Sequence, residues 1–188
     1  METHTIFFVG KPGCGKGTQA KILSEKTGWP VISAGQQFRT LATEDTPVGR
    51  KVKLEHEVGL LQPHWLAMHL YLKALFALPA DTNVIFDGFN RKVPEAELVI
   101  DSMQWLERSF SVIHLPISDD EVVRRIENRK QTAARPDDGV VPERLREYAI
   151  YTTPAIELFR KKGVLIEVDG EQTPEKIAED IRKALGLT

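Results

Sequence analysis

The sequence contains a single cysteine, Cys14, among its 188 residues. One cysteine excludes an intrachain disulfide and leaves no set of thiols for a cysteine-rich metal site. The apolar runs are short, and none approaches the roughly 20 residues that a membrane-spanning helix needs. The polar residues 1–4 ahead of the first apolar run do not resemble a signal peptide. We therefore expect a cytoplasmic protein that does not enter the membrane.

An excess of charge of one sign is also absent. The 25 Lys and Arg residues and 27 Asp and Glu residues give a net charge of −2 at neutral pH. Without a basic excess we expect no binding to nucleic acid, and side chains that bind phosphate groups must be gathered locally. The length corresponds to about one domain. We expect a single domain over residues 1–188 that acts as a monomer.

The sequence does contain five short apolar runs that alternate with helical patterns. This alternation predicts an α/β fold in three layers, in which helices cover both faces of a central five-stranded parallel sheet. The predicted strands cover 6–9, 31–32, 84–86, 111–115 and 164–168. The predicted helices include 18–26, 63–78, 118–129, 142–162 and one that begins at about 173.

Two insertions interrupt this alternation. About fifty residues separate the second and third strands, which is too many for one crossover helix. The patterns at 39–44 and 48–58 predict a helical insertion within about 33–62, ahead of the crossover helix. The polar run at about 129–139, broken by Pro136 and Gly139, predicts a short second insertion. Both would emerge at the carboxyl ends of the strands, where they could close over a ligand.

The clearest motif is Gly-Lys-Pro-Gly-Cys-Gly-Lys-Gly-Thr at 10–18, between the first strand and the first helix. Its glycines let the backbone curl so that successive N–H groups point at an anion, and the helix N-terminus adds a positive end. Lys16 supplies a mobile charge for the outer phosphates. The spacing matches a Walker loop, although Gly17 stands where most such loops carry Ser or Thr. The motif predicts a P-loop NTPase fold.

Further charged residues fit a reaction on phosphate groups. Asp87 ends the third strand, where a Walker-B acid organises water around Mg²⁺. Charge runs are often solvated faces, but phosphoryl transfer spreads negative charge over three oxygens and is catalysed by positioned cations. Six side chains could supply that field: Lys16, Arg39, Arg91, Arg129, Arg135 and Arg144.

These segments together resemble the adenylate kinase and nucleoside monophosphate kinase family, in its short-lid form. Residues 10–20 match its first motif, and 33–39 are similar to Ser-Thr-Gly-Asp-x-x-Arg. Residues 59–63 resemble Gly-x-Leu-Val-Pro, and 87–91 resemble Asp-Gly-Phe-Pro-Arg. Arg129, residues 135–138 and Arg144-Leu145 resemble the lid and its hinge, without the zinc-binding lid of longer members.

The resemblance implies reversible transfer of the γ-phosphoryl group of ATP to AMP, which gives two ADP, with Mg²⁺ as the cofactor. It implies ATP binding by Gly13, Cys14, Gly15, Lys16, Gly17, Thr18, Arg129 and Gln172. It implies AMP binding by Ala34, Arg39, Leu61, Gln62, Gly88, Arg91, Glu95, Arg135 and Arg144. The implied catalytic residues are Lys16, Asp87, Arg91, Arg129, Arg135 and Arg144. Mg²⁺ would be held through water near Thr18 and Asp87, with no direct protein ligand.

The departures from the family pattern gather around the acceptor base. Ala34 replaces Thr, Gln62 replaces Val, and Glu95 stands where adenylate kinases place the Gln that reads adenine. An ionised Glu can only accept hydrogen bonds. A kinase that prefers CMP, UMP or GMP is therefore an alternative, and Glu95 could instead point to solvent in the first turn of a helix. A nucleotide-binding regulator without catalysis is a further alternative, against which the intact Lys16 argues.

Overall fold

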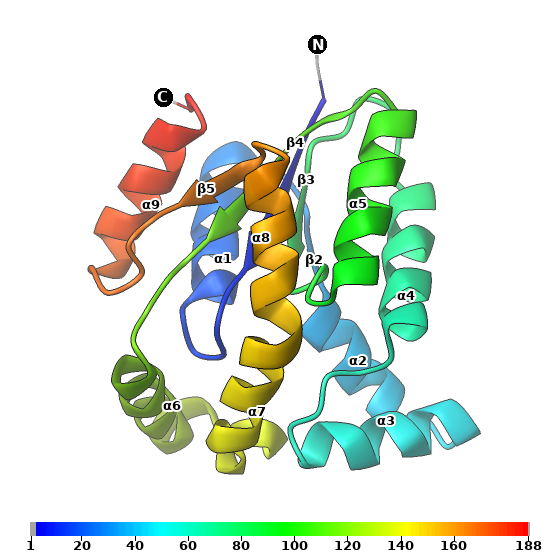
Figure 1. The fold of residues 1–188 in the computed structure, drawn as a ribbon, viewed down its shortest axis with the longest axis vertical. Helices are drawn as coiled ribbons and strands as arrows, with labels where there is room; N and C mark the ends of the chain where they lie inside the picture. Colours follow the sequence, from blue (N-terminus) through cyan, green and yellow to red (C-terminus); the bar gives the residue numbers. More distant parts are fainter. Residues whose placement is uncertain (1–2, 188) are drawn as a thin grey trace.

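A sheet of five parallel strands forms the centre of the computed structural model, which describes residues 3–187 apart from the side chain of Pro136. The strand order is β2-β3-β1-β4-β5 (Figure 1). The strands are β1 (His4–Val9), β2 (Val31–Ser33), β3 (Val84–Asp87), β4 (Ser109–His114) and β5 (Leu165–Glu167). The predicted α/β fold with a central five-stranded parallel sheet is confirmed.

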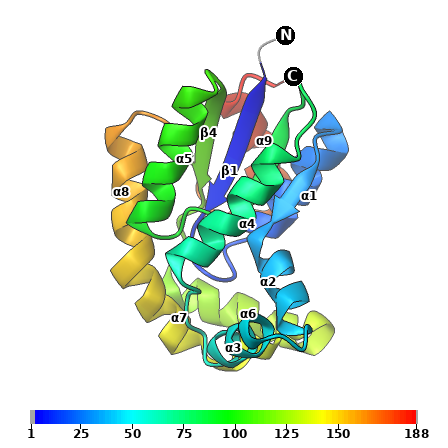
Figure 2. The same ribbon diagram turned by 90° about the vertical axis from the view of Figure 1, so that its right-hand side faces the viewer.

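Helices cover both faces of this sheet. Figure 2 shows α5 and α8 on one side of the strands and α1 and α9 on the other. The helices are α1 (Lys16–Thr27), α2 (Ala34–Ala42), α3 (Pro47–Glu57), α4 (His64–Phe76), α5 (Val93–Trp105), α6 (Asp119–Ala133), α7 (Val141–Glu147), α8 (Thr153–Lys161) and α9 (Pro174–Ala184). Within residues 3–187, no helix has the length and apolar content needed to cross a bilayer.

Alternate side chains of the strands enter two separate cores. Phe7 and Phe86 lie in the core formed with α4, α5 and α8. Ile6 and Ile85 lie in the core formed with α1, α6 and α9. Successive side chains of a strand point to opposite faces, so a sheet covered on both sides needs continuous apolar runs. This is the reason that the strands could be located from the sequence.

The first helix after β2 begins earlier than the sequence pattern indicated, although still within the predicted insertion at about 33–62. Helix α2 starts at Ala34 rather than at 39, because the hydroxyl of Ser33 caps it and accepts a hydrogen bond from the backbone N–H of Gln36 at 3.4 Å. Thr46 caps α3 in the same way, through the N–H of Gly49 at 2.9 Å. Figure 1 shows α3, α6 and α7 together beyond the carboxyl ends of the strands.

Two other helix boundaries differ from the sequence predictions. Helix α6 continues to Ala133, so Arg129 lies within a helix rather than at the start of a loop. The helix predicted at 142–162 is interrupted by a π-helical turn over Tyr148–Thr152, between α7 and α8. Pro154 lacks an N–H and cannot continue the regular hydrogen-bond pattern, which explains the wider turn just before it.

Candidate functional site

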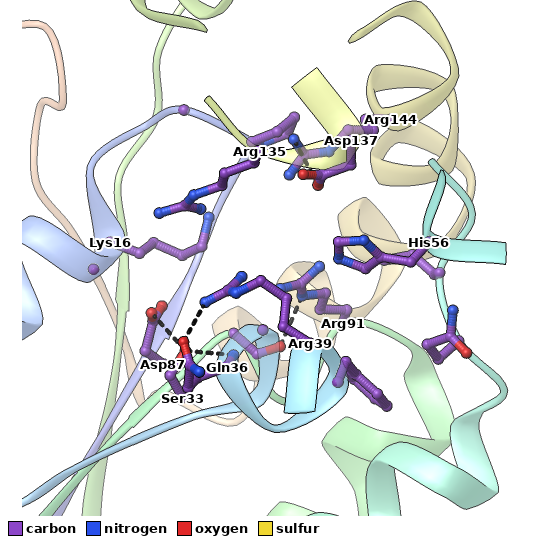
Figure 3. Close-up of a pocket in the computed structure, with 18 of the residues that line it drawn as sticks. Lys16, Ser33, Gln36, Arg39, His56, Asp87, Arg91, Arg135, Asp137 and Arg144 are labelled. Carbon is purple, nitrogen blue, oxygen red and sulfur yellow. Dashed lines mark hydrogen bonds and ion pairs between the residues drawn. The ribbon is translucent and has the colours of Figure 1, made fainter. Parts of the chain in front are cut away.

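A cavity of about 720 Å³ lies at the carboxyl ends of the strands, between α1, the insertion and the segment from α6 to α7. The charged ends of Lys16, Arg39 and Arg135 point into the same space (Figure 3). The structure brings fifteen of the predicted site residues to this cavity: Gly13, Gly15, Lys16, Gly17, Thr18, Arg39, Leu61, Gln62, Asp87, Gly88, Arg91, Glu95, Arg129, Arg135 and Arg144.

The loop before α1 has the conformation of an anion-binding turn. Gly13 and Gly15 have φ angles of 76° and 100°, in the left-handed region that glycine adopts without strain. Gly15 precedes α1 and, as the N-cap residue, has no side chain to cap the first N–H groups of that helix. These groups therefore remain open to an anion. Lys16 is held against the curled loop, since its Nζ donates to the carbonyl oxygens of Gly10 at 2.8 Å and Lys11 at 2.9 Å.

Asp87 lies beside the start of α1. It ends β3, and its Oδ2 accepts a hydrogen bond from the hydroxyl of Ser33 at 3.4 Å. A Cβ atom at Gly17 would lie 3.5 Å from the same Oδ2, so the carboxylate adjoins the loop. Thr18, one residue further on, also lines the cavity. These oxygen atoms would hold the water bound to a Mg²⁺ ion near the loop.

A second set of cations lies on the other wall of the cavity. Arg39 comes from α2 and donates to Oε1 of Gln36 at 3.0 Å. Arg91 follows β3, and its Nε donates to the carbonyl oxygen of Gly88 at 2.7 Å. Gly88 has a φ of 77°, and a Cβ atom there would come within 2.7 Å of the Arg91 guanidinium, so the turn requires glycine. Burial lowers the pKa of Arg39.

Two buried acids hold the arginines of the segment from α6 to α7. Asp138 is 2% exposed, forms an ion pair with Arg129 and accepts a hydrogen bond from the backbone N–H of Arg135 at 2.9 Å. Arg144 pairs with Asp137 at 2.9 Å. Burial lowers the pKa of Arg144 to about 10, against the opposing effect of Asp137. These pairs hold the arginines in place without removing them from the cavity wall.

Glu95 lies at the cavity, as the resemblance implied, and not at the surface as the alternative hypothesis had it. It is only 5% exposed, so it does not point to solvent. Its Oε2 accepts hydrogen bonds from the backbone N–H groups of Arg91 at 2.6 Å and Lys92 at 3.2 Å. Burial raises the pKa of Glu95, and the two backbone N–H groups lower it. Glu95 therefore holds the turn that carries Arg91 while it also lines the cavity.

Three predicted site residues do not line the cavity. Cys14 is fully buried under the loop, and a Cβ atom at Gly10 would lie 2.8 Å from its Sγ, so only a small side chain fits. Ala34 lies in the hydrophobic core with 1% exposure. The Gln172 amide donates to Asp180 at 3.1 Å, so its side chain is directed to α9.

The sequence reasoning missed several lining residues. Arg125 lines the cavity and donates to the carbonyl oxygens of Gly170 at 2.7 Å and Cys14 at 3.4 Å. It lies four residues before Arg129 on α6, and this helical spacing was the signal that could have identified it. His56 on α3 was missed because no motif includes it, and burial lowers its pKa.

Two groups of cations that face each other across one cavity, one of them around a phosphate-binding loop, are suited to bring two phosphate chains together. A family model described as adenylate kinase matches residues 8–164. The chain therefore belongs to that family, whose class is the nucleoside monophosphate kinases.

Three relatives resemble the chain over nearly its whole length. It is 36% identical over 188 residues to the adenylate kinase of Thermus thermophilus, and the match covers 98% of this chain and 98% of the relative. It is 36% identical over 184 residues to adenylate kinase 1 of Nostoc sp., with 96% of this chain and 98% of the relative covered. It is 34% identical over 183 residues to the adenylate kinase of Clavibacter michiganensis subsp. michiganensis, covering 96% of this chain and 92% of the relative.

Proposed function

We propose that the protein transfers the γ-phosphoryl group of ATP to AMP, in a reversible reaction that gives two ADP. The observation that carries the proposal is the cavity of about 720 Å³, whose lining gathers eight Lys and Arg side chains in a chain of net charge −2. Such a concentration of cations fits two nucleotides with their phosphate chains joined end to end.

The loop side binds the donor. The backbone N–H groups of 13–18 hold the β- and γ-phosphates, and Lys16 lies against the group that is transferred. Arg129 flanks the donor from α6, and Arg125 contacts both the loop and the carbonyl of Gly170. Gly170 lies two residues before Gln172 in the chain, so its contact with Arg125 supports placing the donor base beside the backbone of Gln172.

The opposite wall binds the acceptor and the transferred group. Arg39 and Arg91 hold the acceptor phosphate, and an oxygen of that phosphate attacks the γ-phosphorus in line with the leaving group. A bond forms between these two atoms while the bond from the γ-phosphorus to the β,γ-bridging oxygen breaks. Arg135 and Arg144 stabilise the negative charge on the three equatorial oxygens. No side chain forms a covalent intermediate.

The residues near the loop fit a Mg²⁺ ion held mainly by nucleotide oxygens and water. Among the residues that the structure describes, no group of three or more His, Cys, Asp or Glu side chains could hold a metal ion. Asp87 and Thr18 both line the cavity beside the loop and would orient the bound water. When bound, such an ion would supply positive charge that stabilises the negative charge of the phosphate groups.

The monomeric state and the cytoplasmic location stay predictions. Light scattering coupled to size-exclusion chromatography tests the first, with an expected mass close to the 21.2 kDa of the chain.

The proposal is tested by measuring ADP release with AMP, CMP, UMP and GMP at equal concentration. We expect the highest kcat/KM with AMP and Mg-ATP. A higher value with CMP, UMP or GMP would contradict AMP as the acceptor. ATP binding in calorimetry without ADP release from any monophosphate would indicate the non-catalytic alternative. Preparations of a Lys16→Ala variant serve as the control for a contaminating kinase.

A further inference from the structure

The side-chain amide of Gln62 is buried without a hydrogen-bond partner. The residue is 6% exposed, and neither Oε1 nor Nε2 has a partner among residues 3–187. Burial of an unpaired amide disfavours folding, because the group loses its bonds to water. Asn90 also has both amide atoms buried and unpaired, but it does not line the main cavity, whereas Gln62 does. A molecule bound in the cavity is therefore the candidate partner for the amide of Gln62.

The backbone around Gln62 is held from both sides. The N–H of Leu61 donates to Glu147 at 2.9 Å, and the Leu61 carbonyl oxygen accepts from Nζ of Lys92 at 3.4 Å. Pro63 follows at once and precedes the first turn of α4, with its φ at −55°. The position of the Gln62 backbone is therefore fixed before a ligand binds.

Gln62 belongs to the less polar part of the cavity. Apart from Pro12, the large apolar lining residues all come from 31–67, the segment that contains Gln62: Val31, Phe38, Leu60 and Leu61. Four arginines of the lining come instead from 125–144. A nucleoside monophosphate has one anionic and one heteroaromatic end, and this division assigns its base to the segment with Gln62.

We propose that the side-chain amide of Gln62 reads the base of the acceptor nucleotide. Oε1 accepts a hydrogen bond from the 6-amino group of adenine, and Nε2 donates one to the neighbouring ring nitrogen. This rests on the proposed function, in which AMP is the acceptor. Glu95 does not duplicate this role, since its Oε2 already accepts two backbone N–H groups and a carboxylate has no donor for the ring nitrogen. Two departures from the family pattern are thereby linked: the donor lost at Glu95 is replaced by the amide of Gln62.

The test combines a change in the enzyme with a change in the substrate. Gln62→Leu is compared with the wild type for AMP and for purine riboside 5′-monophosphate, which lacks the 6-amino group. In the wild type we expect kcat/KM to fall about tenfold or more when the amino group is removed, which is the effect of one lost hydrogen bond in a closed site. In Gln62→Leu, we expect the kcat/KM values for the two monophosphates to differ less than threefold. The KM for ATP should stay unchanged.

Separate outcomes distinguish this inference from the proposed function. An unchanged KM for AMP in Gln62→Leu, or an undiminished preference for the amino group, overturns the role of Gln62 while the kinase activity stands. A wild type that releases no ADP with AMP overturns both. Gln62→Glu keeps the shape but removes the donor, so we expect a raised KM for AMP here too; a KM equal to that of the wild type contradicts the proposal.

Thermal unfolding separates a role in binding from a role in folding. Gln62→Leu removes an unpaired amide, so we expect a midpoint equal to or above that of the wild type together with the weaker use of AMP. A lower thermal midpoint, together with an equal rise in the KM for AMP and the KM for ATP, would indicate a structural role and overturn the proposal. Gln104→Leu is the matched control, because Gln104 is exposed on α5 and does not line the cavity.

Discussion

The carboxylate of Glu147 accepts a hydrogen bond from the backbone N–H of Leu61, with 2.9 Å between N and Oε2. The two residues are 86 positions apart in the chain, and Glu147 is 8% exposed. The bond joins the last residue of α7, the helix that carries Arg144, to the loop that carries Gln62. It therefore connects the arginine side of the cavity with the segment assigned to the acceptor base.

Loss of this bond should affect the acceptor more than the donor. For Glu147→Ala we expect the free energy of unfolding to fall by about 1.5–3 kcal/mol, since the partly buried Leu61 N–H loses its charged partner. The KM for AMP should rise several-fold while the KM for ATP stays within twofold. Chemical denaturation and initial rates measure these effects.

A variant on the same helix provides the control. Glu143→Ala removes an acid whose pair with Arg146, at 3.5 Å, is largely exposed, so we expect less than about 1 kcal/mol of destabilisation and unchanged kinetics. Equal effects of the two variants on the KM for AMP would contradict a specific role of Glu147.

Removal of the Lys16 charge should reduce turnover rather than folding. For Lys16→Met we expect kcat to fall by about 100- to 1000-fold, the usual effect of removing one group that stabilises transition-state charge. Burial lowers the pKa of Lys16, so replacing it by an uncharged side chain is not expected to lower the thermal midpoint. Lys26→Met, at an exposed position near the end of α1, should keep wild-type rates. A Lys16→Met variant with more than a tenth of wild-type kcat would contradict the assigned role.

Asp138 should contribute to both stability and activity. Asp138→Ala leaves Arg129 without its partner, and we expect the free energy of unfolding to fall by on the order of 2 kcal/mol. This value lies between those for buried and for exposed ion pairs, because the Arg129 side chain is 20% exposed. We expect kcat to fall about tenfold or more, since Arg129 and the adjacent Arg135 lose their positions. The control is Glu179→Ala, which removes an exposed pair with Lys176 on α9 and should change neither quantity. Wild-type kcat in Asp138→Ala would refute the positioning role.

The pH dependence of stability should include a contribution from His114. This residue is buried beside Glu167 and Tyr148, with Arg160 and Lys16 nearby, and burial lowers its pKa below the ordinary value of 6.5. Below pH 6.5 the unfolded chain therefore binds more protons at this residue than the folded chain. The free energy of unfolding should fall as the pH decreases from 6.5, by at most about 1.4 kcal/mol per pH unit from this group.

A comparison with His114→Gln isolates this effect. The variant should show a smaller decrease in stability between pH 6.5 and pH 5 in urea denaturation. The pKa of Glu167 is also lowered, mainly by its hydrogen bond from His114, but that contribution is lost only below its ordinary value of 4.5. An equally steep decrease in the variant and the wild type would refute the assignment to His114.

Much of the fold was predictable because its signals are local. The strands show continuous apolar runs, since β1 and β3 are buried on both faces. The start of α2 was misplaced because Gly35 is a poor helix former and its presence argues against a helix there. The hydroxyl of Ser33 nevertheless caps the helix, which therefore starts at Ala34. The π-helical turn before Pro154 was also missed, because the helical periodicity on either side of it is continuous.

The site was predictable only in part, for a related reason. Lys16, Asp87 and Arg91 stand at fixed distances from strand ends, so their sequence context predicts that they meet. Arg125 has no such context, and its position at the cavity depends on how α6 packs against the loop. The hypothesis that Glu95 points to solvent was wrong because its burial depends on α4 and the loop before it, which the local sequence does not describe.

The sequence by itself determined the strand pattern, the phosphate-binding loop and the charges available for phosphoryl transfer, because each rests on neighbouring residues. Only the tertiary structure decided that Glu95 holds a turn, that Glu147 binds the Leu61 backbone and that the Gln62 amide is buried without a partner in the described part of the chain. These features depend on contacts between distant segments, where burial sets whether a polar group is satisfied by water, by protein or by a ligand.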